Sequence, residues 1–155
     1  MPPVLDVDLV MPKLASLPVE VHQEGSLVLA AGTATGKLLV LKEGAVEVVQ
    51  GGVRLAEASE PGAVFGELAV LLGRPHTADV RALRRSTFHV ADGRSYLRAD
   101  PTAALYVAML LARRLQAVNG HLVQARSRLG RAQPAGVVAE MIDNIALTLR
   151  YGPPL

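Results

Sequence analysis

From Val19 to Val90 the apolar residues come in short runs of valine and leucine, and glycines separate these runs. The glycines of this region are Gly25, Gly32, Gly36, Gly44, Gly51, Gly52, Gly62 and Gly66. Because glycine takes the positive φ angles of tight turns at little cost, this pattern is typical of short strands joined by turns. It predicts a small antiparallel β-roll or barrel over this part of the chain.

The clearest strand signals lie in the stretch KLLVLKEGAVEVVQGGVRLAEA. The pattern predicts three strands, over residues 37–42, 45–50 and 53–58. The pair Glu43 and Gly44 predicts a tight turn after the first strand, and the pair Gly51 and Gly52 predicts another after the second. We therefore expect the three strands to pair in chain order, as a meander.

Helices are expected on both sides of the roll. A small helix is expected within residues 5–17, where Pro12 limits it to one or two turns. Asp92 predicts the N-cap of a short helix after the last strand. Asp100 followed by Pro101 is a stronger start signal, because aspartate caps a helix and proline fits its first turn. The longest helix of the chain is expected to begin there.

Along this long helix the apolar residues alternate at spacings of three and four, which is the seam of a coiled coil. The seam consists of Ala108, Leu111, Leu115, Val118, Leu122, Ala125 and Leu129. It predicts a homodimer, although Gly120 inside the seam weakens the helix by roughly 1 kcal/mol relative to alanine. The alternative is that the first half of the helix packs on the roll of its own chain.

After the seam, residues 131–136 predict a break, and residues 137–150 predict a last amphipathic helix. This segment is too short for a helix-turn-helix domain, so no DNA-binding domain is expected. We expect one domain over residues 1–130, followed by a linker and C-terminal helix over residues 131–155 that form no separate domain.

Composition narrows the class of protein. The 155 residues suffice for one domain, and a net charge of +2 gives no bulk attraction to nucleic acid or membrane. The absence of cysteine excludes disulfides and thiolate chemistry. No signal-peptide pattern or membrane span is recognisable, so a cytoplasmic location is expected. Because no serine elbow, P-loop or dinucleotide fingerprint occurs, we expect no enzymatic activity.

One stretch carries a candidate chemistry. Residues 65–82, FGELAVLLGRPHTADVRA, resemble the phosphate-binding cassette of the cyclic nucleotide-binding domain family. The matching positions are Gly66, Glu67, Leu68, Ala69, Pro75, Thr77 and Ala78. The resemblance implies a mainly β fold with flanking helices, a jelly-roll-like antiparallel β-roll (a double-stranded β-helix) followed by a long C-terminal helix. We refer to residues 65–82 as the cassette.

The resemblance also implies roles for cassette residues. Gly66 lets the backbone approach a ligand, and the helix that follows points its amides at the phosphate. Glu67 is expected to accept from the ribose 2'-hydroxyl, and Thr77 to add a hydroxyl donor. The implied ligand is a cyclic nucleotide, cAMP in the first place or cGMP, with no other cofactor. Phe65 lies at the start of the same predicted site.

At the position where the family has an arginine, this chain has His76. Histidine has an unperturbed pKa of about 6.5 and cannot grip two phosphate oxygens as arginine does, so binding is expected to weaken by about ten- to a hundredfold. Arg74 is the better substitute cation, because Arg81 is expected to face the opposite side of a strand. We hypothesise that His76 still donates to the phosphate, with affinity rising as pH falls.

The resemblance extends over residues 19–129. The segment ARRLQ, residues 112–116, resembles the dimerising helix of the catabolite-activator branch, and by that alignment Val118 and Asn119 would reach the purine, across the dimer interface. The implied function is a cyclic nucleotide sensor, a regulatory module that signals through its C-terminal helices. No DNA-reading domain like that of this branch is expected in residues 130–155.

Two other readings remain. In the first, the roll is a ligand-independent module for dimerisation or protein interaction, with a protein partner at the C-terminal helix. In the second, Glu67 and His76 belong to a cupin-type metal site. The remaining histidines, His22, His89 and His121, are scattered along the sequence, which disfavours a metal site.

Overall fold

The structure is a computed structural model, and it describes residues 7–129, 136 and 140–145. The chain divides into two compact units, residues 1–109 and residues 110–155. The division falls inside one long helix, and each unit is described here by itself.

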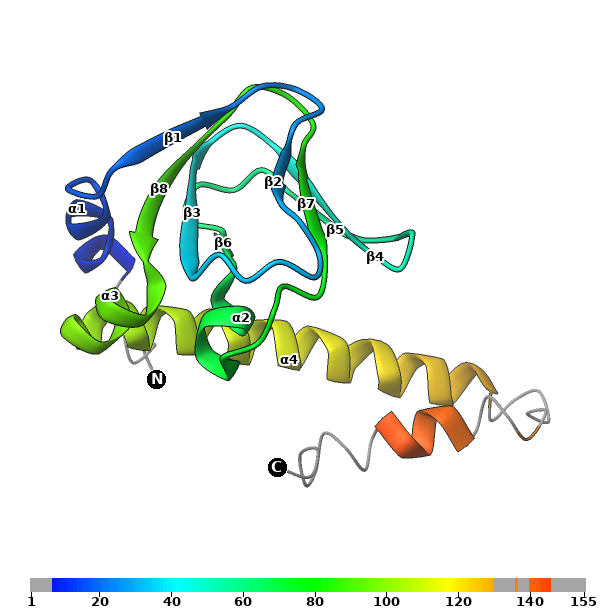
Figure 1. Cartoon of the computed structure of the whole chain (residues 1–155). Helices are drawn as coiled ribbons and strands as arrows, with labels where there is room; N and C mark the ends of the chain where they lie inside the picture. The colour runs from blue at the N-terminus through cyan, green and yellow to red at the C-terminus, as the bar shows by residue number, and fades with distance from the viewer. Residues whose placement is uncertain (1–6, 130–135, 137–139, 146–155) are drawn as a thin grey trace. The chain divides into compact units, whose positions relative to one another are not determined.

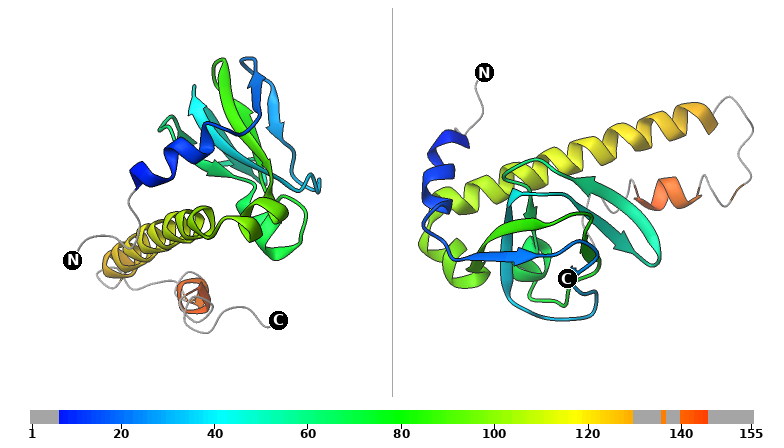
Figure 2. Two further views of the ribbon diagram at one scale, coloured as in Figure 1. Left: turned by 90° about the vertical axis from the view of Figure 1, so that its left-hand side faces the viewer. Right: turned by 90° about the horizontal axis from the view of Figure 1, so that it is seen from above.

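The first unit is built on eight strands in two four-stranded antiparallel sheets. The first sheet has the order β1 (Val19–His22), β8 (Ser86–Asp92), β3 (Lys37–Glu43) and β6 (Val64–Phe65). The second has the order β2 (Leu27–Leu29), β7 (Asp79–Ala82), β4 (Val46–Gln50) and β5 (Val53–Ala58). The two sheets curl around a shared interior (Figures 1 and 2), which confirms the predicted antiparallel β-roll.

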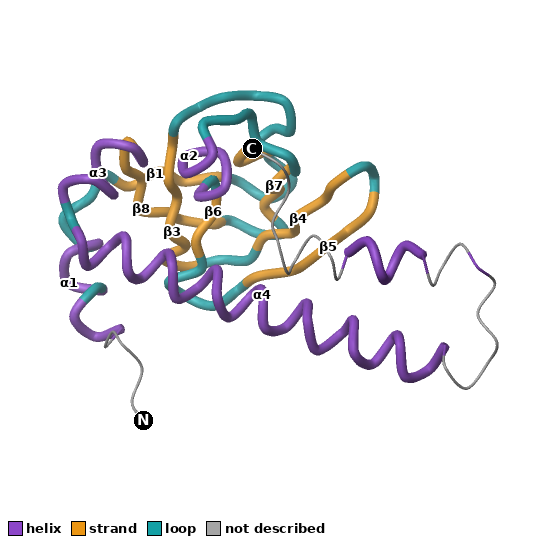
Figure 3. The backbone as a smooth tube through the Cα atoms, turned by 90° about the horizontal axis from the view of Figure 1, so that it is seen from below, coloured by secondary structure: helices purple, strands orange, loops and turns teal. Residues whose placement is uncertain are grey.

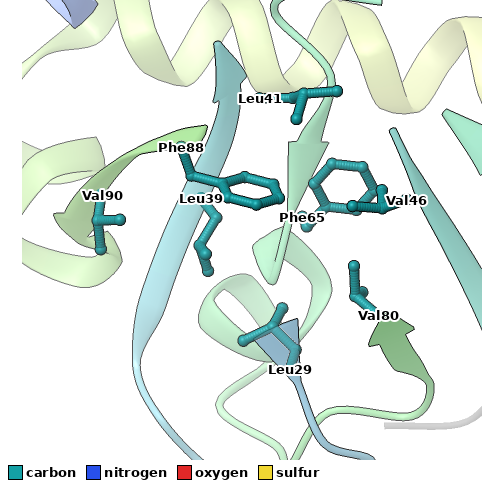
Figure 4. Close-up of a cluster of buried hydrophobic side chains, with 8 residues drawn as sticks. All are labelled: Leu29, Leu39, Leu41, Val46, Phe65, Val80, Phe88 and Val90. Carbon is teal, nitrogen blue, oxygen red and sulfur yellow. The ribbon is translucent and has the colours of Figure 1, made fainter. Parts of the chain in front are cut away.

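The interior of the roll is filled from both sheets. The buried cluster consists of Leu29, Leu39, Leu41, Val46, Phe65, Val80, Phe88 and Val90 (Figure 4). The rings of Phe65 and Phe88 meet edge to face, with 6.2 Å between their centroids. The alternation of strand side chains places these residues on the inner face and their sequence neighbours on the outer face.

The outer face of the first sheet is also covered over part of its area. Leu38, Val40 and Val64 point away from the interior and are nevertheless buried. Helix α1 (Met11–Leu14), its N-cap residue and the first turns of helix α4 (Pro101–Leu129) supply further buried side chains in this unit, namely Val10, Leu14, Ala103, Tyr106 and Val107. The Tyr106 hydroxyl donates to the carbonyl of Gly62, just before β6, at 2.8 Å. We call these eight side chains the outer layer.

The predicted meander is wrong at its first turn. β3 pairs with β6 and β8, whereas β4 pairs with β5 and β7, so the two strands lie in different sheets. Gly44 has a φ of 115° and lies so close to Ser86 that a Cβ at this position would collide with it. The chain therefore crosses from one sheet to the other at Gly44. The second predicted turn, at Gly51 and Gly52, does form the β4–β5 hairpin.

The predicted helix starts are confirmed. Asp92 caps helix α3 (Gly93–Ala99) by accepting from the amide of Ser95, at 2.9 Å. Asp100 accepts from the amide of Thr102 at 2.9 Å, at the first turn of α4. The N-terminal helix has the expected one or two turns: η1 (Val7–Leu9) precedes α1, and Pro12 lies in the first turn of α1.

The second unit contains the rest of α4 and a helical segment at residues 140–145 (Figure 3). Arg126 and Asp143 form an ion pair at 3.1 Å, and Ile142 is buried. Of the predicted last helix, residues 137–150, only residues 140–145 are described, and they are helical. Residues 131–135 of the predicted break lie outside the described residues, and the predicted domain limits stay a prediction. None of the described helices is long and apolar enough to cross a membrane.

Candidate functional site

The cassette starts at the end of β6 and leads through helix α2 (Glu67–Leu72) into β7. Gly66 is the N-cap of α2 and has a φ of 83°. A Cβ at this position would collide with the carbonyl oxygen of Lys37 on β3. It would also lie 3.5 Å from a ring carbon of His76. Only glycine fits here without a shift of the neighbouring backbone, as expected where a chain turns closely past other segments.

Glu67 is the first residue of α2, and its side chain is buried, with 4% of the residue exposed. A buried carboxyl group is uncommon unless other groups compensate it, which makes Glu67 the most informative polar residue of the cassette. Its charge acts on His76, so the two side chains that matter most for the predicted site are electrostatic neighbours.

His76 is also buried, with 6% of the residue exposed. Its Nε2 atom lies 2.8 Å from the hydroxyl oxygen of Thr35, and its backbone amide donates to the carbonyl of Thr33 at 2.8 Å. The carbonyl of His76 accepts from the amide of Gly32, also at 2.8 Å. Three hydrogen bonds therefore tie His76 to the loop between β2 and β3, residues 30–36. Figure 1 shows this loop and the loop after α2 running side by side.

Burial lowers the pKa of His76, and the nearby charge of Glu67 opposes this effect without cancelling it. The imidazole thus stays neutral down to a lower pH than a free histidine does. Thr35 completes a chain of bonds, because its hydroxyl oxygen also accepts from the amide of Lys37 at 3.2 Å.

The remaining predicted residues of the cassette are spread over different surroundings. Phe65 points into the interior of the roll and is part of its buried cluster (Figure 4). Leu68 is 47% exposed, and Ala69 is half-buried. Pro75 and Thr77 are exposed, and Ala78 is half-buried.

The two arginines of the cassette differ in their surroundings. Arg74 is exposed, and its backbone amide donates to the carbonyl of Ala69. The guanidinium of Arg81 donates to the carbonyl of Gly25 at 3.0 Å, in the turn between β1 and β2. Both arginines are exposed, and the side chain of Arg81 has a structural role in that turn.

Sequence reasoning missed the loop of residues 30–36, AAGTATG. Besides the bonds to His76, the amide of Ala31 donates to a carboxylate oxygen of Asp79 on β7, at 2.7 Å. The sequence signal was the pair of glycines, Gly32 and Gly36, with threonines between them. Both glycines have positive φ, which indicates a tightly shaped loop, but nothing in the sequence indicates that it lies beside the cassette.

Val118 and Asn119 lie on α4 in the second unit, and both are exposed. Their expected contact with a purine stays a prediction. The same holds for the predicted dimer seam, which lies on one continuous helix through Gly120. Across the described residues, no group of three or more His, Asp or Glu side chains is placed to hold a metal ion.

Comparison with known proteins gives a consistent picture of the first unit. A family model described as a cyclic nucleotide-binding domain matches residues 19–99, just over half of the chain. Among solved structures, the catabolite activator protein of Thermus thermophilus is similar, with a TM-score of 0.65 and 24% identity. That match covers 79% of this chain and 61% of the other. The second cyclic nucleotide-binding domain of a protein kinase A regulatory subunit, bound to Sp-2Cl-cAMPS, has a TM-score of 0.57 and 21% identity, covering 73% of this chain and 75% of that one.

Curated relatives are longer proteins. Glutaminase 2 of Bradyrhizobium diazoefficiens is 39% identical over 109 residues, which cover 63% of this chain and 17% of the relative. An uncharacterised ABC transporter ATP-binding protein of Mycobacterium bovis is 34% identical over 103 residues, which cover 63% of this chain and 27% of the relative. The matching segment thus spans about a sixth to just over a quarter of the length of these relatives.

Proposed function

Because the chain belongs to the cyclic nucleotide-binding domain family, we propose that the cassette binds a cyclic nucleotide and that the chain is a regulatory sensor module. The observation that carries this proposal is the buried Glu67, placed directly after the positive-φ turn at Gly66. A carboxylate held in this way is a fixed acceptor for the 2'-hydroxyl of a ribose. Both cAMP and cGMP carry that hydroxyl, and cAMP is the ligand to test first.

The exposed hydroxyl of Thr77 and the exposed side chain of Arg74 would face the phosphate side of such a ligand. Val118 and Asn119 would contribute to the purine side, from the partner chain of a homodimer. Binding would then favour one placement of the C-terminal helices, because a ligand shifts an equilibrium towards the state that it binds better. The curated relatives support a module of this kind, since the matching segment is a minor part of each of them.

Calorimetric titration with cAMP and with cGMP tests the proposal. We expect saturable binding to the unmodified chain and its loss in a Glu67→Ala variant. The exposed Glu24 provides a matched control, because Glu24→Ala removes the same group outside the cassette. The ligand should raise the melting temperature of the unmodified chain and of Glu24→Ala, and it should leave that of Glu67→Ala unchanged. An absence of heat with millimolar cAMP and cGMP would overturn the proposal.

One observation favours a second function, a ligand-independent interaction module. On the helical segment 140–145, Met141 and Ile145 lie one turn apart and are 58% and 42% exposed. A protein partner that binds this face equally well in the unmodified chain and in Glu67→Ala would support the interaction module. A partner that binds only in the presence of a cyclic nucleotide would support the sensor.

A further inference from the structure

The positions of the charged side chains in the cassette indicate the chemical class of the ligand. This inference rests on the proposed function, because it concerns the same site and assumes that Glu67 holds a ribose. The cassette contains four formal charges, on Glu67, Arg74, Asp79 and Arg81. Their placement decides whether the negative charge of a phosphate adds to the binding free energy of the ligand.

Backbone groups of neighbouring turns hold the side chains of Asp79 and Arg81. The carboxylate of Asp79 accepts from the amide of Ala31, and the guanidinium of Arg81 donates to the carbonyl of Gly25. Arg74 has an exposed side chain, so water screens its charge. The charge buried in the cassette is the negative one, at Glu67. The cassette therefore brings no buried cation to a phosphate.

His76 does not make up for this deficit. Its imidazole is buried, and its Nε2 atom is engaged by the hydroxyl of Thr35. Its backbone is fixed on both sides, by Thr33 and by Gly32. These bonds hold the imidazole ring between the loop after α2 and the loop of residues 30–36. A neutral ring with one nitrogen occupied can offer at most one hydrogen bond, and it cannot give the paired, charged contact that arginine gives.

We propose that the site recognises the ribose of its ligand far more than the phosphate, and that it binds an uncharged ribonucleoside about as tightly as the corresponding 3',5'-cyclic monophosphate. The 2'-hydroxyl supplies the specific polar contact, to Glu67. The phosphate adds little, since Thr35 and His76 satisfy each other and no buried cation in the described part of the cassette faces it.

The wild-type chain tests this directly, by calorimetric titration at neutral pH with adenosine, cAMP, guanosine and cGMP. We expect each nucleoside and its cyclic monophosphate to have dissociation constants within about threefold of each other. A site with a phosphate-binding cation would instead favour the cyclic monophosphate by about ten- to a hundredfold. The 2'-deoxynucleosides should bind at least about tenfold more weakly than the nucleosides, because they lack the hydroxyl that donates to Glu67.

Two variants sharpen the result. His76→Arg should tighten cyclic nucleotides by about ten- to a hundredfold and leave nucleosides nearly unchanged. A melting curve shows whether the His76→Arg variant folds. If this variant does not fold, the titrations of the wild-type chain still test the inference. Arg85→Gln, which removes an exposed arginine outside the cassette, should leave the ratio of the two ligand classes unchanged.

The outcomes separate this inference from the proposed function. Cyclic nucleotides that bind more than about tenfold tighter than nucleosides would overturn the inference and leave the sensor proposal in place. Nucleosides that bind as tightly as or tighter than cyclic nucleotides would support the inference. Absence of binding by all four ligands would overturn the proposed function, and the inference with it.

Discussion

Gly66 and Gly73 are the two ends of α2, and both have positive φ, of 83° and 62°. Their surroundings differ. A Cβ at Gly66 would collide with the backbone of β3, whereas a Cβ at Gly73 would meet nothing within 4 Å. A side chain at either position would be strained by the positive φ. Only at Gly66 would it also collide with a neighbouring segment.

Substituting each glycine by alanine separates the two effects. Gly73→Ala should lower the free energy of unfolding by about 1 kcal/mol, from the positive φ alone. Gly66→Ala should cost about 3 kcal/mol or more, because β3 must also move. Urea denaturation measures both. Equal losses in the two variants would contradict the predicted clash with Lys37.

The buried histidines predict a pH dependence. Burial lowers the pKa of His76, against the charge of Glu67. Burial together with the charge of Lys42 lowers the pKa of His89, against a backbone hydrogen bond with Leu17. The unfolded chain then binds protons first as pH falls through about 6.5, so the free energy of unfolding should decrease from about pH 7 towards pH 5.

Denaturation curves over this pH range provide the measurement. His89→Gln should flatten the dependence, because an amide takes up no proton in either state. The exposed His121 supplies the control, since His121→Gln should leave the slope nearly unchanged. A free energy of unfolding that rises as pH falls from 7 to 5 would show that the assumed sign is wrong.

At the scale of elements, local signals were sufficient for the helices and insufficient for the pairing of strands. Asp92 and Asp100 cap α3 and α4 through amides two or three residues away, so a short window of sequence contains both partners. The crossing at Gly44 depends on Ser86, far along the chain. Nothing near Gly44 distinguishes such a crossing from a hairpin turn, and this is why the meander was predicted wrongly.

The same reasoning applies to the site. The identities of Gly66, Glu67 and His76 were visible in the sequence, and so was the short helix after Gly66. The role of Thr35 was not, because its bond to His76 joins residues 41 positions apart. Sequence reasoning treated His76 as a ligand group, and only the fold shows that its ring is buried against another loop.

The start of α4 offers a test of the capping signal. The carboxylate of Asp100 accepts from the helix amides and also pairs with Lys13 of α1, at 3.2 Å. Asp100→Ala removes both interactions and should cost about 1–2 kcal/mol. Asp100→Asn keeps the cap and loses the ion pair, so it should cost less than about 1 kcal/mol. Thermal melts rank the variants, and an asparagine variant as unstable as the alanine variant would contradict the capping role.

At the scale of the whole molecule, the seam on α4 predicts self-association. Leu115 and Val118 are 45% and 46% exposed in the single chain, as expected for side chains that pack only in a dimer. Val123 lies off the seam and is 70% exposed. Leu115 is therefore expected to pack in the dimer and Val123 is not, although both side chains are apolar and exposed.

Sedimentation equilibrium distinguishes these roles. The unmodified chain should sediment as a dimer at micromolar concentration, and Leu115→Lys should shift it to a monomer, because a charge in the seam is desolvated on association. Val123→Lys should leave the dimer intact. A monomeric unmodified chain, or equal effects of the two variants, would contradict the seam.

The outer layer has a practical consequence for anyone who isolates the domain. The family match begins at Val19 and ends at Ala99, so a fragment cut to those limits lacks Val10, Leu14, Ala103, Tyr106 and Val107. The apolar groups that these five side chains contact would then be open to water, which invites aggregation, and the hydrogen bond from Tyr106 to Gly62 would be lost. A workable expression fragment has to start before Val10 and to retain the first turns of α4.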